Sequence, residues 1–255
     1  MGTDWASYLE DYHERNAGIT EALLDHSTHP DGRGPYDYLA AQIPVATTSI
    51  LDVASGSAPT AARIPQTVAY HGFDRSRGEL AVAAKNYPGR LFVQADAKAV
   101  PFATASADTV ICSMALMLLD PLVEAICEIT RVLRPGGTFV AMYPSIGLPK
   151  LREVPTIIAL CAALRSAPEF PSHLRKSGIT KTFAEAGLQL DSYVSRRYTI
   201  PIESDADAAR LVTGLYLPSV PPERIASAQA ALAKRAGPAT SLPMYITHVS
   251  ARAES

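Results

Sequence analysis

Short apolar runs alternate with amphipathic stretches along the middle of the chain. Runs typical of buried strands occupy residues 49–53, 67–73, 90–93, 109–113 and 138–143. Between them, apolar residues at helical spacing predict helices over 79–86 and 121–133. In the second of these, a proline begins the helix and Pro-Gly-Gly ends it. Strands that alternate with helices predict βαβ units and a mostly parallel sheet.

The two ends of the chain have a less regular pattern. Helices are expected at 154–165, 174–186, 205–216 and 223–236, and strands at 188–194 and 244–251. The first 44 residues predict one or two helices with a turn-rich joint at 29–35. The expected fold is therefore α/β: a doubly wound, mostly parallel seven-stranded sheet with helices on both faces, plus N-terminal helices and a helical cap.

Composition and charge exclude several classes of protein. The chain has 255 residues, of which 47% are hydrophobic and 19% charged, as expected of a globular protein. A net charge of −2 without a long basic stripe argues against a nucleic-acid partner. No apolar run approaches the roughly 18–20 residues of a membrane span, and the polar start lacks the features of a signal peptide. We expect a cytoplasmic protein without a membrane partner.

The cysteines do not form a pattern that binds metal. Cys112, Cys127 and Cys161 lie among apolar neighbours, which predicts three buried, reduced thiols. No cluster of cysteine and histidine has the spacing of a metal site, so no metal is expected.

Small residues and carboxylates follow the ends of the predicted strands. The first strand ends at Asp52 and passes into the loop 54–58, whose small side chains allow a ligand to approach the backbone closely. Asp74 ends the second strand, where a carboxylate can accept both hydroxyl groups of a ribose. Asp96 ends the third strand, where it can accept the exocyclic amine of adenine.

The order of these segments resembles the class I S-adenosylmethionine-dependent methyltransferases, in particular the branch that modifies small molecules. The resemblance covers about residues 49–143 and rests on ILDVASGSA, YHGFD, QADAKAVPF, ADTVICSMALMLL and RVLRPGG. The loop of that family usually runs Gly-x-Gly-x-Gly, and Ala54 and Ala58 replace the first and third glycines here. Because alanine avoids the unusual dihedral angles of glycine, a displaced loop and weaker cofactor binding are expected.

The resemblance implies S-adenosylmethionine as cofactor and S-adenosylhomocysteine as product. It implies that Asp52 and the loop hold the methionine end, that Asp74 binds the ribose, and that Asp96 reads the adenine edge. The complete set of implied cofactor-binding residues is Tyr12, Asp52, Ala54, Ser55, Gly56, Asp74, Arg75, Asp96, Ala97, Ser113 and Met114.

The resemblance also implies a division of the chain and a set of residues near the acceptor. Residues 1–44 would close over the cofactor, and 45–255 would form the cofactor-binding domain with cap insertions at about 144–173 and 203–240. Histidine is the usual base near neutral pH, so His13 and His173 are the candidates for catalysis. The candidates for the acceptor pocket are Tyr8, Leu116, Met117 and Tyr143. A plain packing or surface role is the alternative for each of them.

The predicted activity is methyl transfer to a small, partly hydrophobic acceptor in secondary metabolism, with O-, N- and C-methylation all open. One alternative is a methyltransferase-like fold that is silent or that uses the cofactor for a rearrangement or cyclisation. A nicotinamide-dependent dehydrogenase is a second alternative, although the chain lacks Gly-x-Gly-x-x-Gly. A protein- or RNA-modifying enzyme is a third. Whether the protein forms a homodimer is left open.

Overall fold

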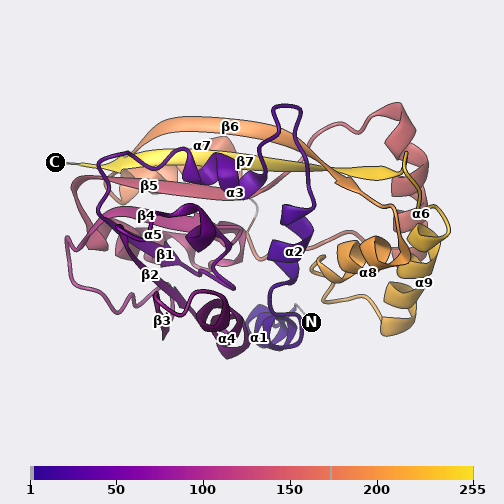
Figure 1. Ribbon diagram of the computed structural model, residues 1–255, viewed down its shortest axis with the longest axis horizontal. Helices are drawn as coiled ribbons and strands as arrows, with labels where there is room; N and C mark the ends of the chain where they lie inside the picture. Colours follow the sequence, from indigo (N-terminus) through magenta and orange to yellow (C-terminus); the bar gives the residue numbers. More distant parts are fainter. Residues whose placement is uncertain (1–2, 173, 255) are drawn as a thin grey trace.

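The computed structural model describes residues 3–172 and 174–254, arranged around one seven-stranded sheet (Figure 1). The strands are β1 (Ser49–Val53), β2 (Ala69–Asp74), β3 (Leu91–Gln94), β4 (Ala107–Ser113), β5 (Leu133–Ser145), β6 (Leu188–Pro201) and β7 (Ser241–Ala253). Their order is β3-β2-β1-β4-β5-β7-β6. The pairs among β1 to β5 are parallel, and β7 runs antiparallel to both β5 and β6. The predicted doubly wound, mostly parallel sheet is confirmed.

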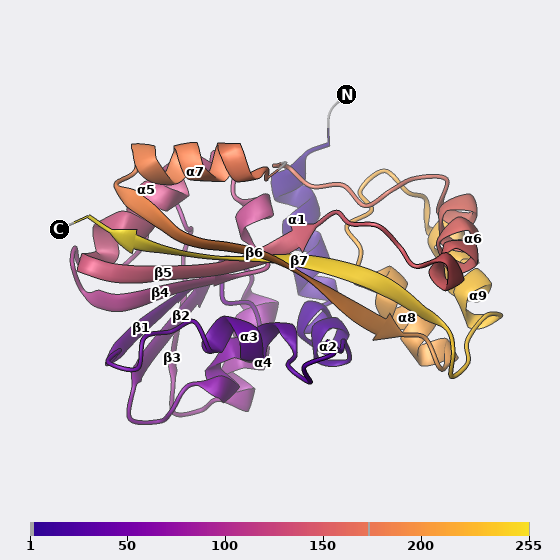
Figure 2. The same cartoon turned by 90° about the horizontal axis from the view of Figure 1, so that it is seen from above.

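Helices cover both faces of the sheet (Figure 2). They are α1 (Trp5–Arg15), α2 (Ile19–Asp25), α3 (Pro35–Ala40), α4 (Arg77–Asn86), α5 (Leu122–Val132), α6 (Val154–Leu164), α7 (Lys176–Glu185), α8 (Asp205–Thr213) and α9 (Pro222–Ala233). On one face, α5 and α7 pack on a core that includes Leu51 and Phe139. On the other, α3 and α4 pack on a core that includes Ile50 and Val140. Successive residues of a strand thus enter opposite cores, as strand geometry requires.

The last two strands are longer than the sequence predicts. They pair along almost their whole length, from Leu188 opposite Ala253 to Pro201 opposite Ser241. Backbone pairing therefore extends β6 through a polar stretch that has no clear strand pattern. Both strands reach beyond the rest of the sheet and carry a separate group of helices, α6, α8 and α9 (Figure 2). These helices come from the two segments that were expected to form a cap.

The N-terminal segment contains three helices in its described part, where one or two were predicted. The additional helix, α3, begins directly after the predicted turn-rich joint. Pro35 stands at its first position, and the Asp37 carboxylate accepts a hydrogen bond from the Gly34 N–H. A proline at the first position and an acceptor for a free N–H both favour a helix start.

The environment of the cysteines corrects one prediction. Cys112 is buried in β4, as expected, but Cys127 and Cys161 are exposed. Both lie on apolar helices, so their sequence neighbours did not distinguish the buried face from the solvent face. Among residues 3–172 and 174–254, no helix is both long enough and apolar enough to cross a bilayer.

Candidate active site

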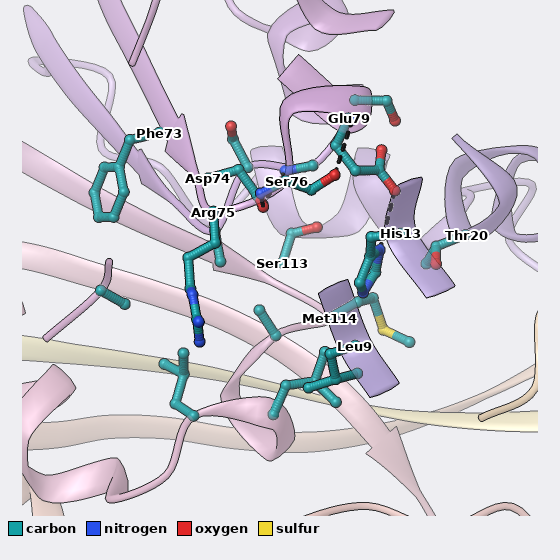
Figure 3. Close-up of a pocket in the computed structure, with 18 of the residues that line it drawn as sticks. Leu9, His13, Thr20, Phe73, Asp74, Arg75, Ser76, Glu79, Ser113 and Met114 are labelled. Carbon is teal, nitrogen blue, oxygen red and sulfur yellow. Dashed lines mark hydrogen bonds and ion pairs between the residues drawn. The ribbon is translucent and has the colours of Figure 1, made fainter. Parts of the chain in front are cut away.

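A cavity of about 450 Å³ lies at the carboxyl ends of β1, β2 and β4 (Figure 3). The strand order reverses between β1 and β4, which is where ligands bind in open α/β sheets. Residues of α1, of the loop after β1, of the end of β2 and of the loop after β4 contribute to its wall. Among the residues that line it are Leu9, His13, Glu21, Ala54, Ser55, Gly56, Asp74, Arg75, Glu79, Asp96, Ala97, Ser113, Met114, Leu118, Leu119 and Tyr216.

The loop after β1 has a left-handed backbone at three positions. The φ angles are 52° at Ala54, 53° at Gly56 and 60° at Ala58. The Ser55 N–H donates to the carbonyl oxygen of Phe73 over 2.9 Å, and the Ala58 N–H donates to that of Ser55 over 2.8 Å. The expectation that the alanines would avoid this conformation is wrong, because tertiary hydrogen bonds hold the loop in it.

We expect that Ala54→Gly raises the free energy of unfolding by about 1 kcal/mol, since a left-handed backbone costs an L-residue about that much relative to glycine. Urea titration measures the change. Ala230, on an exposed position of α9, is a matched control, because glycine there should lower stability by about 1 kcal/mol. Destabilisation by Ala54→Gly comparable to that of Ala230→Gly would contradict the prediction.

Asp52 lies buried at the end of β1, beneath this loop. Its Oδ2 accepts a hydrogen bond from the Tyr70 hydroxyl, and its Oδ1 has no hydrogen-bond partner among the described residues. Burial raises the pKa of Asp52 to about 7; the Tyr70 hydrogen bond opposes this shift, and the nearby Asp74 carboxylate adds to it. A buried carboxyl oxygen without a partner is costly, which marks it as a position for a ligand donor.

Asp74 connects the loop after β1 to the start of α4. Its Oδ2 accepts the Gly56 N–H over 2.8 Å, and its Oδ1 accepts the Ser76 N–H over 2.9 Å. Desolvation raises its pKa, and these two hydrogen bonds lower it. Each carboxylate oxygen has a further lone pair, so Asp74 can still accept two hydroxyl groups from the cavity.

Asp96 and Arg75 form another part of the cavity wall. The Arg75 Nε lies 3.8 Å from an Asp96 carboxylate oxygen, and the other oxygen accepts the Lys98 N–H over 2.9 Å. Figure 3 shows the Arg75 side chain extending along the cavity from the end of β2.

His13 lies between two partners that the sequence did not indicate. Its Nδ1 is 3.1 Å from Glu79 Oε1 (Figure 3). Its Nε2 is 3.2 Å from the Tyr216 hydroxyl. Glu79 is buried and also accepts the Gly18 N–H over 3.0 Å. In the tautomer that donates Nδ1–H to Glu79, Nε2 carries no proton and can accept one. The arrangement is suited to general-base chemistry at the cavity wall.

Glu79 and Tyr216 were missed because no local pattern distinguishes them. Ser76, three residues before Glu79, matches the signature of a helix start, and its hydroxyl accepts the Glu79 N–H. The signature would have located the start of α4. It could not have revealed that the Glu79 side chain turns away from its own helix end towards α1.

Tyr12 links α1 to the last residue of α8, and Tyr8 links α1 to the segment after α8. The Tyr12 hydroxyl donates to the Thr213 carbonyl oxygen over 2.7 Å, and the Tyr8 hydroxyl accepts the Leu217 N–H over 2.8 Å. The described lining of the cavity includes neither tyrosine. Both support the helix that presents His13, and their contact with a ligand stays a prediction.

The structure brings most predicted cofactor residues together and separates the predicted acceptor residues from the cavity. All of the implied cofactor residues except Tyr12 and Asp52 line it. Leu116, Met117 and Tyr143 are instead buried in the core beside α5 and α7, where neighbouring side chains cover them. This packing does not support their assignment to the acceptor pocket. His173 lies outside the described residues.

Comparison with known proteins agrees with this geometry. A sequence family described as the methyltransferase domain matches residues 51–141, which include the loop after β1, Asp74, Asp96 and Ser113. Residues 51–141 resemble a methyltransferase domain.

Curated proteins similar to this methyltransferase domain match it over part of their length. Demethylmenaquinone methyltransferase of Beutenbergia cavernae is 36% identical over 92 residues, which are 36% of this chain and 38% of that protein. Phthiotriol/phenolphthiotriol dimycocerosates methyltransferase 1 of Mycobacterium ulcerans is 28% identical over 144 residues, 54% of this chain and 53% of that protein. The chain thus spans between about a third and about half of the length of these relatives.

Solved structures share the fold over nearly the whole chain. The [4+2]-cyclase SpnF has a TM-score of 0.64 at 16% identity, covering 96% of this chain and 95% of its own. A putative methyltransferase from Bacillus halodurans has a TM-score of 0.58 at 20% identity, covering 87% and 99%. At such low identity, these likenesses show the fold alone.

Proposed function

We propose that the protein is an S-adenosylmethionine-dependent methyltransferase that transfers a methyl group to a small, partly hydrophobic organic acceptor. The observation that carries the proposal is Asp74. Its carboxylate faces the cavity at the point where the strand order reverses, and it is held by the backbone of Gly56 and Ser76.

The residues around the cavity fit the chemical groups of this cofactor. The Ser55 hydroxyl lines the cavity without a hydrogen-bond partner among the described residues, so it would receive a polar atom of the methionine part. Asp52 does not line the cavity, and its carboxyl would act from beneath the loop. Asp74 would hold the ribose, and Asp96 with the backbone of Ala97 would hold the adenine edge. When bound, the cofactor supplies an electrophilic methyl group on its sulfonium.

The charge of the cavity supports a cationic ligand. Six carboxylates line it, against two permanently cationic side chains, Arg75 and Lys98; the carboxylates belong to Glu10, Glu21, Asp74, Glu79, Asp96 and Asp120. S-adenosylmethionine carries a sulfonium and an ammonium against one carboxylate, so a negative wall favours it. The product lacks the sulfonium charge, so the same wall favours its release.

The acceptor would lie against α1, near His13. Leu9, Leu118 and Leu119 give this part of the wall an apolar surface, and His13 Nε2 lies there with the Tyr216 hydroxyl. His13 would remove a proton from the acceptor as the methyl group arrives. The names of the two curated relatives suggest demethylmenaquinone and phthiotriol-type compounds as the first acceptors to screen. We further propose a cytoplasmic role in secondary metabolism, and a homodimer stays a prediction.

Calorimetric titration tests the cofactor assignment. We expect S-adenosylmethionine and S-adenosylhomocysteine to bind, NAD not to bind, and Asp74→Asn to weaken cofactor binding by about a hundredfold. Two hydrogen bonds to a charged carboxylate contribute about 1.5 kcal/mol each, which gives this factor. The matched control is Asp191→Asn on β6, whose carboxylate pairs only with Arg252 on the surface. Equal affinity in Asp74→Asn and Asp191→Asn, or binding of NAD, would refute the assignment.

Cyclisation or rearrangement is not proposed as a second function. Its support is the fold likeness to one cyclase at 16% identity, and that likeness shows the fold alone.

A further inference from the structure

The segment between β5 and α6 exposes large aliphatic side chains to an unusual degree. The exposed fraction is 101% for Ile146, 85% for Leu148 and 92% for Leu151. Ile158, one turn into α6, is 61% exposed. Single exposed aliphatic residues are ordinary, but a run of them within one short segment indicates an interaction surface. We name residues 146–152 the apolar loop.

The apolar loop is fastened to the protein at both ends. Gly147 packs so closely on the Tyr245 ring of β7 that a Cβ would lie 2.3 Å from the ring, and the Tyr245 hydroxyl donates to the Leu148 carbonyl oxygen over 2.7 Å. At the other end, buried Glu153 accepts the Lys150 N–H over 2.7 Å and pairs with Arg197. With its backbone held in this way, the loop cannot turn its aliphatic side chains onto the protein.

Positive charge lies between the exposed aliphatic side chains. Lys150 and Arg152 are exposed, and the ion pairs of the described residues include neither of them. The adjacent carboxylate, Glu153, is buried and already paired. The outward surface of the loop is therefore apolar and cationic. This composition suits a lipid interface, where aliphatic side chains enter the acyl boundary and cations contact anionic headgroups.

We propose that the apolar loop docks the protein onto the surface of a bilayer that contains anionic phospholipid. A second copy of the chain fits this surface less well. In a two-fold dimer the same patch meets itself, which would bring Lys150 and Arg152 of the two copies together. The sequence predicted no membrane partner because it contains no spanning segment, and contact at the surface of a bilayer requires none.

Flotation with vesicles tests the proposal on the full chain. One set of vesicles is phosphatidylcholine, and the other is phosphatidylcholine mixed with phosphatidylglycerol. We expect the wild-type protein to float with the mixed vesicles and to lose binding as salt is added. The triple variant Ile146→Ser, Leu148→Ser, Leu151→Ser and the double variant Lys150→Glu, Arg152→Glu should each reduce partitioning by at least about tenfold.

A control separates this loop from exposed apolar residues in general. Val45→Ser alters a fully exposed aliphatic residue in the segment before β1, and it should partition like the wild type. Circular dichroism and light scattering on every variant report folding and oligomeric state. Failure of the wild type to bind either set of vesicles would overturn the proposal. Equal partitioning of the triple variant and Val45→Ser would also overturn it. A third contrary result would be a wild-type protein that does not bind lipid but forms a dimer, with the dimer lost in the triple variant.

Discussion

Replacing His13 with alanine will lower the rate of methyl transfer by about a thousandfold while leaving the affinity for S-adenosylmethionine within a few-fold of wild type. Positioned proton transfer contributes about a hundredfold to ten-thousandfold to the rate of a reaction. His13 is the histidine at the cavity wall with both ring nitrogens bonded, to Glu79 and to the Tyr216 hydroxyl. The measurement is the initial rate of S-adenosylhomocysteine release with an acceptor found in the screen.

Three further variants distinguish catalysis from folding. His26→Ala is the matched control, because His26 is exposed after α2 and bonds the Ala22 carbonyl oxygen, away from the cavity. Glu79→Gln keeps the shape of the partner but removes its charge, and we expect about a tenfold loss of rate, in line with one charged hydrogen bond. Tyr216→Phe removes the bond to Nε2. If the turnover of His13→Ala matches that of His26→Ala, the base lies elsewhere.

Raising the pH from about 4 to about 7 will reduce the stability of the wild-type protein relative to Asp52→Asn by about 3 kcal/mol. In the folded protein the pKa of Asp52 is about 7, against about 3.9 in an unfolded chain. Below pH 4 both states hold the proton, and the stabilisation is complete. As the pH rises, the unfolded chain ionises first, so the stabilisation falls until the folded carboxyl also ionises near pH 7. Three pKa units at about 1.4 kcal/mol each give about 4 kcal/mol over the whole range. About 3 kcal/mol of this falls between pH 4 and pH 7, because the unfolded carboxyl is already half ionised at pH 4.

Urea titrations at intervals between pH 4 and pH 7 measure this difference. Other groups that titrate in this range are present in both proteins, so their contributions cancel in the difference between the two free energies of unfolding. His248 is an example: burial lowers its pKa to about 3, which acts in the opposite direction. Asp191→Asn, on the surface of β6, should give a profile parallel to the wild type. Parallel profiles for the wild type and Asp52→Asn would show that Asp52 is ionised in the folded protein throughout, contrary to the burial argument.

Local pattern was sufficient to predict most of the residues that gather around the cavity. The apolar run of β1 and the small residues of the loop after it follow each other directly in the sequence, so both could be predicted together. The apolar pattern also predicts that the second strand ends at Asp74. Because β1 and β2 are parallel neighbours, their carboxyl ends lie at the same edge of the sheet, and no other pattern is needed to predict that they are close together. The same pattern could not predict the left-handed dihedral angles of Ala54 and Ala58, since hydrogen bonds from distant backbone override the preference of alanine.

The proposed acid–base group, His13 with Glu79 and Tyr216, depends on packing that the sequence does not reveal. His13 could be named as a candidate because histidine is an uncommon residue with suitable chemistry. Glu79 resembled an ordinary helix residue and Tyr216 an ordinary apolar one, and their approach to His13 depends on how α1 packs on α4 and on the segment after α8. The choice of acceptor-pocket residues is not supported, for a related reason. Leu116, Met117 and Tyr143 were chosen because they follow strand ends, but neighbouring core side chains cover them.

The contacts between α1 and the segment that ends α8 and follows it restrict how such a protein can evolve by recombination. His13 and Tyr216 both lie outside the region that matches the methyltransferase domain family, one near each end of the chain. Tyr8 and Tyr12 join the same two pieces. A recombinant that keeps the middle of the chain and exchanges a single flank would separate a histidine from its phenol. We therefore expect the two flanks to be inherited, or exchanged in the laboratory, as a pair, whereas residues 51–141 can be kept unchanged.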